Sequence, residues 1–91
     1  MFALTERAAA LIQTLIHKAD MHPGSGLRFS LEPACGALVM SLVARPVRAD
    51  TVFTFGNARV FLAPSTVTRL DRQTLDAHVS ERSRAFFLRD S

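Results

Sequence analysis

The sequence predicts a small, mostly β domain that begins with one helix, an α+β chain by content. An apolar repeat of helical period near the N-terminus is followed, from residue 27, by short runs of period two or of continuous apolar residues. Turn-forming residues separate these runs. We expect the strands to close into a compact barrel or sandwich. With 91 residues, the chain suffices for a single domain, residues 1–91.

The expected helix begins after Thr5. The Thr5 side chain suits an N-cap, and Glu6 lies where a negative charge stabilises the helix dipole. Apolar residues then recur at helical spacing in one stripe: Ala8, Leu11, Ile12, Leu15, Ile16 and Ala19. The helix should end near Ala19, because residues 21–26 (MHPGSG) are typical of a loop.

The centre of the chain predicts four strands. Residues 27–32 alternate apolar and polar side chains, as in a half-buried strand, and residues 33–36 (PACG) interrupt it. Residues 37–44 are almost all apolar and predict a strand buried on both faces. Residues 51–55 and 58–63 predict two further strands, joined by a hairpin turn at Gly56 and Asn57, which both tolerate positive φ.

The last third predicts a short helical turn and two closing strands. The turn begins at residues 64–66 and carries Val67 and Leu70, and the strands cover residues 75–79 and 85–88. Asp71 and Asp76 are interpreted as turn and strand-start residues rather than as a catalytic pair.

Composition narrows the classes of function. The net charge is +3, but the basic residues are scattered, apart from Arg82, Arg84 and Arg89. A dense basic stripe and exposed stacking aromatics are both lacking, so nucleic-acid binding is a third hypothesis that rests on charge alone. No signal peptide is visible, and residues 37–44 are too short to span a bilayer. We therefore expect a cytoplasmic protein without a membrane partner.

Several segments resemble, in order, the HesB/IscA family of A-type iron–sulfur carriers. Residues 4–9 (LTERAA) resemble the Leu/Ile-Thr/Ser-x-x-Ala start of the family's first helix, and residues 26–29 (GLRF) resemble its glycine-led Leu-Arg strand. Residues 61–71 (FLAPSTVTRLD) resemble its Val-Asp-x-x-Ser-x-x-x-Leu-x-Gly segment, and residues 75–76 resemble its Leu/Ile-Asp pair. Cys35 stands at the family's first cysteine. The resemblance covers about residues 4 to 90 and implies a HesB-like fold.

The chain departs from the family at its ligand motifs. In place of Cys-x-Gly-x-x-Tyr it has residues 35–40 (CGALVM), so the glycine comes one position early and Met40 replaces the aromatic residue. The family's Cys-Gly-Cys, which supplies its second and third ligands, is absent, because Cys35 is the single cysteine. The resemblance therefore implies a degenerate carrier that keeps at most one family ligand.

Cys35 has two interpretations. A free cysteine often behaves as a small buried hydrophobe. Alternatively, a thiolate in the break between two strands is stabilised by backbone N–H groups and binds iron or an iron–sulfur cluster. A cluster is held mainly by four thiolates, so further donors must come from a second chain, from external thiols, or from His17, His22 and His78. His22, in the loop after the helix, is the expected additional metal ligand, although no histidine here has the spacing of a metal site.

Two hypotheses for function follow. The first is a non-enzymatic iron–sulfur cluster assembly or carrier protein that binds iron or a cluster through Cys35, across a homodimer, and meets assembly or acceptor proteins. The alternative is a protein-interaction domain that kept the fold and lost cluster binding, and that works through a strand edge or the basic C-terminal residues. We expect no enzyme activity, because no acid or histidine forms a recognised signature with Cys35.

Overall fold

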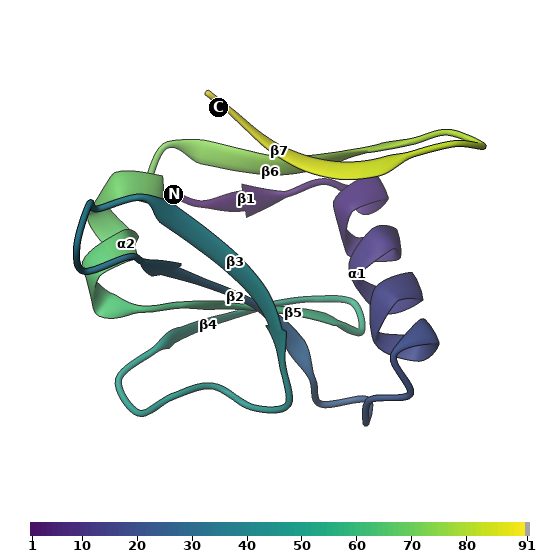
Figure 1. The fold of residues 1–91 in the computed structure, drawn as a ribbon, viewed down its shortest axis with the longest axis horizontal. Coiled ribbons are helices and arrows are strands. Elements are labelled where there is room, and N and C mark those ends of the chain that lie inside the picture. The colour runs from purple at the N-terminus through teal and green to yellow at the C-terminus, as the bar shows by residue number, and fades with distance from the viewer. Residues whose placement is uncertain (91) are drawn as a thin grey trace.

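The computed structural model describes residues 1–90, which form two helices and seven strands (Figure 1). In chain order these are β1 (Ala3–Leu4), α1 (Glu6–Lys18), β2 (Gly26–Leu31), β3 (Leu38–Val43), β4 (Thr51–Phe55), β5 (Ala58–Leu62), α2 (Pro64–Leu70), β6 (Gln73–Val79) and β7 (Arg84–Asp90). The predicted α+β content, with a helix near the N-terminus and many short strands, is confirmed.

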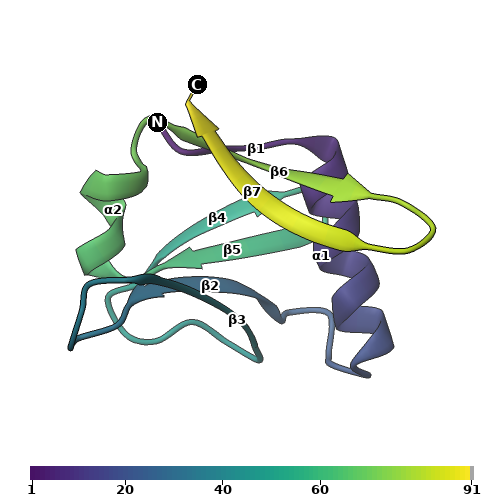
Figure 2. The same ribbon diagram turned by 45° about the horizontal axis from the view of Figure 1, so that its top comes forward.

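The strands form two small mixed sheets. The order of the first is β1-β6-β7, in which β1 runs parallel to β6 and β7 runs antiparallel to it. The order of the second is β3-β2-β5-β4, in which β2 and β5 are parallel and both outer strands are antiparallel to their neighbours. The two helices stand at opposite ends of these sheets in both views (Figures 1 and 2). The expected compact arrangement of short strands is therefore confirmed.

Helix α1 forms where the sequence predicts it. Thr5 is the N-cap, and its hydroxyl oxygen accepts a hydrogen bond from the Ala8 N–H at 3.1 Å. Ala19 is the C-cap. The apolar stripe packs against both sheets and buries Ala8, Ala9, Leu11, Ile12 and Ile16. Within residues 1–90, neither helix combines the length and the apolar character needed to cross a bilayer.

The core lies between the two sheets and α1. Strand β2 is half-buried as predicted, because Leu27 and Phe29 face this core. The rings of Phe2 and Phe29 meet edge to face with centroids 6.2 Å apart, so the residue before β1 packs on the second sheet. The remaining buried members of the core come from β5, β6 and α2: Ala58, Val60, Leu62, Leu70, Leu75 and Ala77.

The prediction that residues 37–44 form a strand buried on both faces is wrong. Strand β3 lies at the edge of the second sheet and pairs with β2 alone. Val39 and Met40 are 39% and 44% exposed. A continuous apolar run is typical of a central strand, but the order of strands in the sheet decides which strand lies at the edge.

The other predicted elements are confirmed with shifted ends. The β4–β5 hairpin turns at Gly56, whose φ is +61°, whereas Asn57 keeps a negative φ, as in a type II′ turn. The helical turn at residue 64 extends to Leu70 as α2, with Pro64 in its first turn. Strands β6 and β7 each begin before the predicted residue. The sequence did not indicate the two-residue strand β1.

The connection between β3 and β4 has to cross the whole second sheet, because these strands occupy its two edges. It runs over the face that is turned away from β6 and β7 (Figure 1). Arg28, on that face of β2, donates two hydrogen bonds to the Asp50 carboxylate at 2.8 and 3.0 Å. These hydrogen bonds from Arg28 lower the pKa of Asp50, and a further bond from the Val47 N–H acts in the same direction. The pair thus ties the connection to the sheet.

Substitution of Gly26 tests how closely β2 and β5 approach. A methyl group added there would lie 2.5 Å from the Arg59 carbonyl oxygen, which is backbone and cannot move away. We expect Gly26→Ala to lower the free energy of unfolding by about 1–3 kcal/mol, measured by urea denaturation. Ser30→Ala, on the same face of the same strand, is the control and should change it by less than about 0.5 kcal/mol. Equal stability of the two variants would contradict the close contact.

Candidate functional site

Cys35 lies in the hairpin loop between β2 and β3. It is exposed and is the free thiol of the chain. The interpretation of Cys35 as a small buried hydrophobe is therefore wrong. The loop stands at the same end of the molecule as α2 (Figure 1), and Arg69 of α2 donates a hydrogen bond from Nη1 to the Gly36 carbonyl oxygen at 2.7 Å.

Glu32 holds this loop in shape. Its N–H donates to the Ala37 carbonyl at 2.8 Å, and its carbonyl oxygen accepts from the Gly36 N–H at 2.7 Å. Its carboxylate accepts from the Ala34 N–H at 3.1 Å. Gly36 has a φ of +71°, a conformation that glycine adopts without strain. The thiol is thus displayed on a loop whose backbone is tied at both ends.

These bonds change the expected electrostatics of Cys35. The Ala34 N–H donates to the Glu32 carboxylate and the Gly36 N–H donates to the Glu32 carbonyl, so neither N–H is free to stabilise a thiolate. The same loop also carries the Glu32 carboxylate, an oxygen donor three residues before the cysteine, which accepts from the N–H of Ala34, the neighbour of Cys35.

The structure separates His22 from Cys35. His22 precedes β2 and Cys35 follows it, so the six residues of that strand, at about 3.3 Å per residue, lie between them. The His22 Nδ1 accepts a hydrogen bond from the Gly24 N–H at 3.0 Å. In residues 1–90, no three His, Cys, Asp or Glu side chains gather as a metal site. One chain therefore does not unite Cys35 with any of its histidines in such a group.

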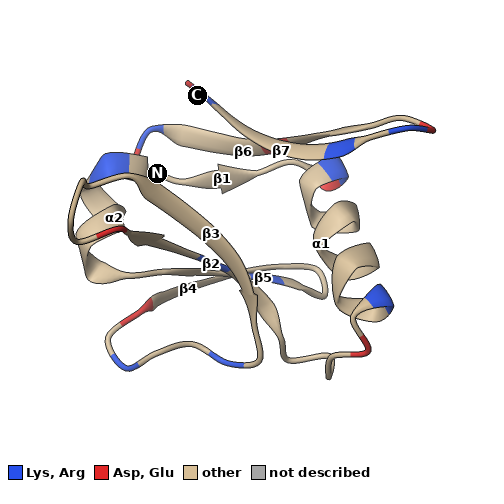
Figure 3. Cartoon of the chain, in the orientation of Figure 1, with Lys and Arg blue, Asp and Glu red and all other residues tan. Residues whose placement is uncertain are grey.

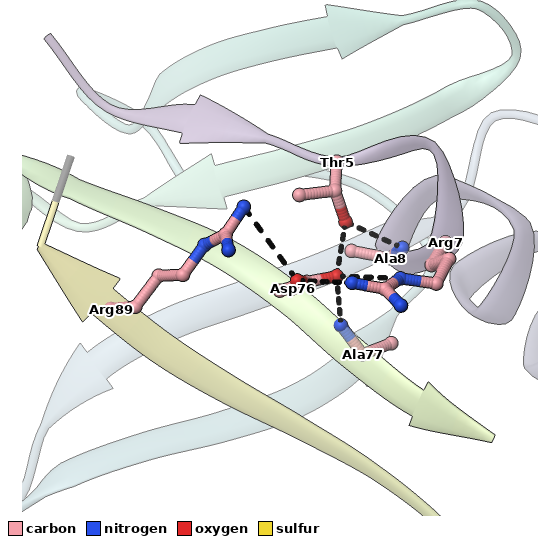
Figure 4. Close-up of polar contacts among 6 residues, drawn as sticks. All are labelled: Thr5, Arg7, Ala8, Asp76, Ala77 and Arg89. Carbon is pink, nitrogen blue, oxygen red and sulfur yellow. Dashed lines mark hydrogen bonds and ion pairs between the residues drawn. The ribbon is translucent and has the colours of Figure 1, made fainter.

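Asp76, which the sequence analysis interpreted as a strand-start residue, is buried and charged (Figure 4). One carboxylate oxygen accepts from the Thr5 hydroxyl at 2.6 Å and from the Ala77 N–H at 2.8 Å. The other accepts from Arg7 at 2.8 Å, and Arg89 lies 3.7 Å away. Asp76 is the fourth residue of β6 rather than its start. These partners make the Asp76 carboxylate part of a structural ion pair.

The hydrogen bond from Thr5 is the largest cause of a pKa shift in Asp76. Together with the bonds from Ala77 and Arg7, it lowers the pKa of this carboxyl to about 2, although burial opposes the shift. The carboxylate is therefore ionised at any pH above about 3 in the folded protein.

Solved structures share this arrangement of elements, whereas the sequence matches no family model and no curated protein sequence. SufA of Escherichia coli, involved in the biosynthesis of iron–sulfur clusters, superposes with a TM-score of 0.78 at 24% identity, over 98% of this chain and 84% of SufA. IscA, solved with a [2Fe-2S] cluster, gives 0.71 at 19% identity over 99% and 85%. The chain has a HesB/IscA-like fold. A protein from Aquifex aeolicus, solved by NMR, gives 0.77 at 19% identity over 99% and 91%.

The HesB/IscA-like fold was predicted from short segments, and their structural roles explain why they were informative. Thr5 caps α1, Gly26 allows β2 to approach β5, and the Leu75-Asp76 pair contributes a core side chain and a buried carboxylate. Each of these residues is required by the backbone arrangement. They indicate the HesB/IscA-like fold without indicating what the chain binds.

The low pKa of Asp76 predicts loss of stability in acid. In the unfolded chain an aspartate has a pKa near 3.9, so the unfolded state takes up a proton first as the pH falls. The free energy of unfolding should decrease between about pH 4 and the folded pKa of about 2. In Asp76→Asn, the free energy of unfolding should depend less on pH over this range. The same variant should lower the melting temperature at pH 7 by about 5 °C or more.

Calorimetric melting from pH 7 to pH 2 provides the measurement. Asp20→Asn is the control, because Asp20 is exposed and an asparagine tolerates its positive φ. That variant should keep the pH dependence of the wild type. An Asp76→Asn variant with an unchanged dependence would show that the buried carboxylate is not its source.

Proposed function

We propose that this protein is a degenerate iron–sulfur cluster carrier of the A type, which binds iron or a cluster as cargo without enzyme activity. The supporting observation is the exposed thiol of Cys35 on a tied hairpin of a HesB/IscA-like fold. SufA and IscA share that fold; SufA is involved in the biosynthesis of iron–sulfur clusters, and IscA was solved with a [2Fe-2S] cluster.

The number of ligands requires two chains. A cluster takes about four ligands, mostly thiolates. One chain supplies Cys35, and its Glu32 carboxylate lies in the same loop. A symmetric homodimer that brings two such hairpins together supplies two thiolates, and the Glu32 carboxylates or external thiols provide the remaining two ligands. His22, at the other end of β2, joins only as a ligand from a neighbouring copy, and ligation through Nε2 places the proton on Nδ1, where it breaks the bond to Gly24.

A carrier of this kind holds its cargo weakly. An incomplete ligand set exchanges easily with a partner that offers more thiolates, so assembly and acceptor proteins in the cytoplasm are the proposed partners. The exposed position of Cys35 leaves the thiol accessible to such a partner.

The alternative function is a protein-interaction domain without a cluster. The observation that favours it is the edge strand β3, which exposes Val39 and Met40 and whose outer side is unpaired within residues 1–90. Arg84 and Arg89 lie at opposite ends of β7, so they do not form the basic patch that their proximity in sequence indicated.

Anaerobic reconstitution with ferrous iron, sulfide and glutathione tests the carrier proposal. We expect the wild type to develop visible absorbance, with iron close to one cluster per dimer, and Cys35→Ser to develop almost none. Size-exclusion chromatography should show that the coloured species is the dimer. Glu32→Gln should hold less iron than wild type, whereas Glu81→Gln, in the exposed turn of the β6–β7 hairpin, should be unchanged.

Two results would overturn the carrier proposal. Wild type that stays colourless while it remains folded favours the interaction domain. Equal colour in wild type and Cys35→Ser shows that the iron is held elsewhere. Circular dichroism of each variant confirms that the fold is intact.

A further inference from the structure

A concave site lies between α1 and the β6–β7 hairpin, away from Cys35. The cavity measures about 500 Å³, within the range of small-molecule sites. One wall is a single face of α1 and the other is formed by the end of β6 and the start of β7. The lining residues are Arg7, Ala10, Leu11 and Thr14 from the helix, and Ala77, His78, Val79 and Arg84 from the strands.

The cavity exists because β1 is much shorter than β6. Strand β1 pairs only with Thr74 and Leu75, after which the chain turns into α1. The remainder of β6, as far as Val79, therefore has no strand on this side. The Leu75 carbonyl accepts from the Thr5 N–H, and the Ala77 N–H donates to the Asp76 carboxylate. Alternate residues of β6 therefore direct their backbone polar groups toward the side of the strand where β1 ends and α1 begins. Val79 is the next residue in this alternation, so its N–H is a further hydrogen-bond donor on the same side of β6.

The ionisable side chains of the cavity are arginines and a histidine. Arg7, His78 and Arg84 line it, and no carboxylate does. Arg7 is already paired with Asp76, whose oxygens are held by Thr5, Arg7 and Ala77. The Arg84 guanidinium has no hydrogen bond or ion pair within the described part of the chain. In Figure 3 the basic segments at the start of α1 and the start of β7 lie close together.

We propose that this pocket binds a small organic anion, a phosphate or carboxylate group carried on an apolar body. The planar guanidinium of Arg84 suits the two oxygens of such a group, and it is the arginine of the pocket whose charge is not already paired with Asp76. The Thr14 hydroxyl provides a further donor. The buried side chains of Leu11 and Ala77 form an apolar floor for the rest of the ligand. This site is independent of the proposed role of Cys35.

Phenyl phosphate is the probe, titrated into ¹⁵N-labelled protein at an ionic strength of about 0.15 M, where distant charges are screened. We expect shifts of the Thr14, Ala77 and Val79 amides. Arg84→Gln should weaken binding about tenfold, the loss typical of a hydrogen bond to a charged group. Benzyl alcohol, which lacks the anion, should not bind, and the affinities of phenyl phosphate and benzoate distinguish phosphate from carboxylate.

Arg82→Gln is the matched control. It removes the same charge two residues away, in the exposed turn, and Arg82 does not line the pocket. The affinity of this variant should equal that of wild type. Equal weakening in both arginine variants would show general attraction to a basic protein and overturn the site, as would shifts confined to residues outside the pocket. Both arginines are exposed, so both variants should fold.

Discussion

The buried carboxylate of Asp76 joins parts of the chain that lie 71 residues apart in sequence. Thr5 caps α1 with the same hydroxyl that donates to Asp76, so the start of the helix and the middle of β6 share one group. The neighbouring N–H of Thr5 donates to the Leu75 carbonyl at 3.0 Å. A buried carboxylate is costly unless each oxygen has partners, and here both do. The placement of α1 against the two sheets depends on this junction.

The second sheet depends on a similar arrangement. Its edge strands are consecutive in sequence, and the connection between them is held on the outer face by Asp50 and Arg28. The close approach of β2 to β5 at Gly26 leaves no room for a side chain. Both features fix long-range positions rather than local conformation. They leave the β2–β3 hairpin free to extend past the sheet and present Cys35 to solvent.

The polar and charged groups of both proposed sites lie outside the hydrophobic core. Cys35 is placed by backbone bonds within one loop and by Arg69. The basic pocket follows from the early end of β1, where a helix replaces the strand that would otherwise cover β6. A shared fold therefore does not dictate either function, because both depend on surface residues that can change without loss of the core.

The sequence by itself determined α1, the β4–β5 hairpin and the half-buried strand β2, because capping, turn formation and side-chain alternation involve residues only a few positions apart. The resemblance of short segments also predicted the fold. Only the tertiary structure placed β3 at an edge, formed β1, buried Asp76 and separated His22 from Cys35. These features depend on strand order and on contacts between distant residues, which local patterns do not encode.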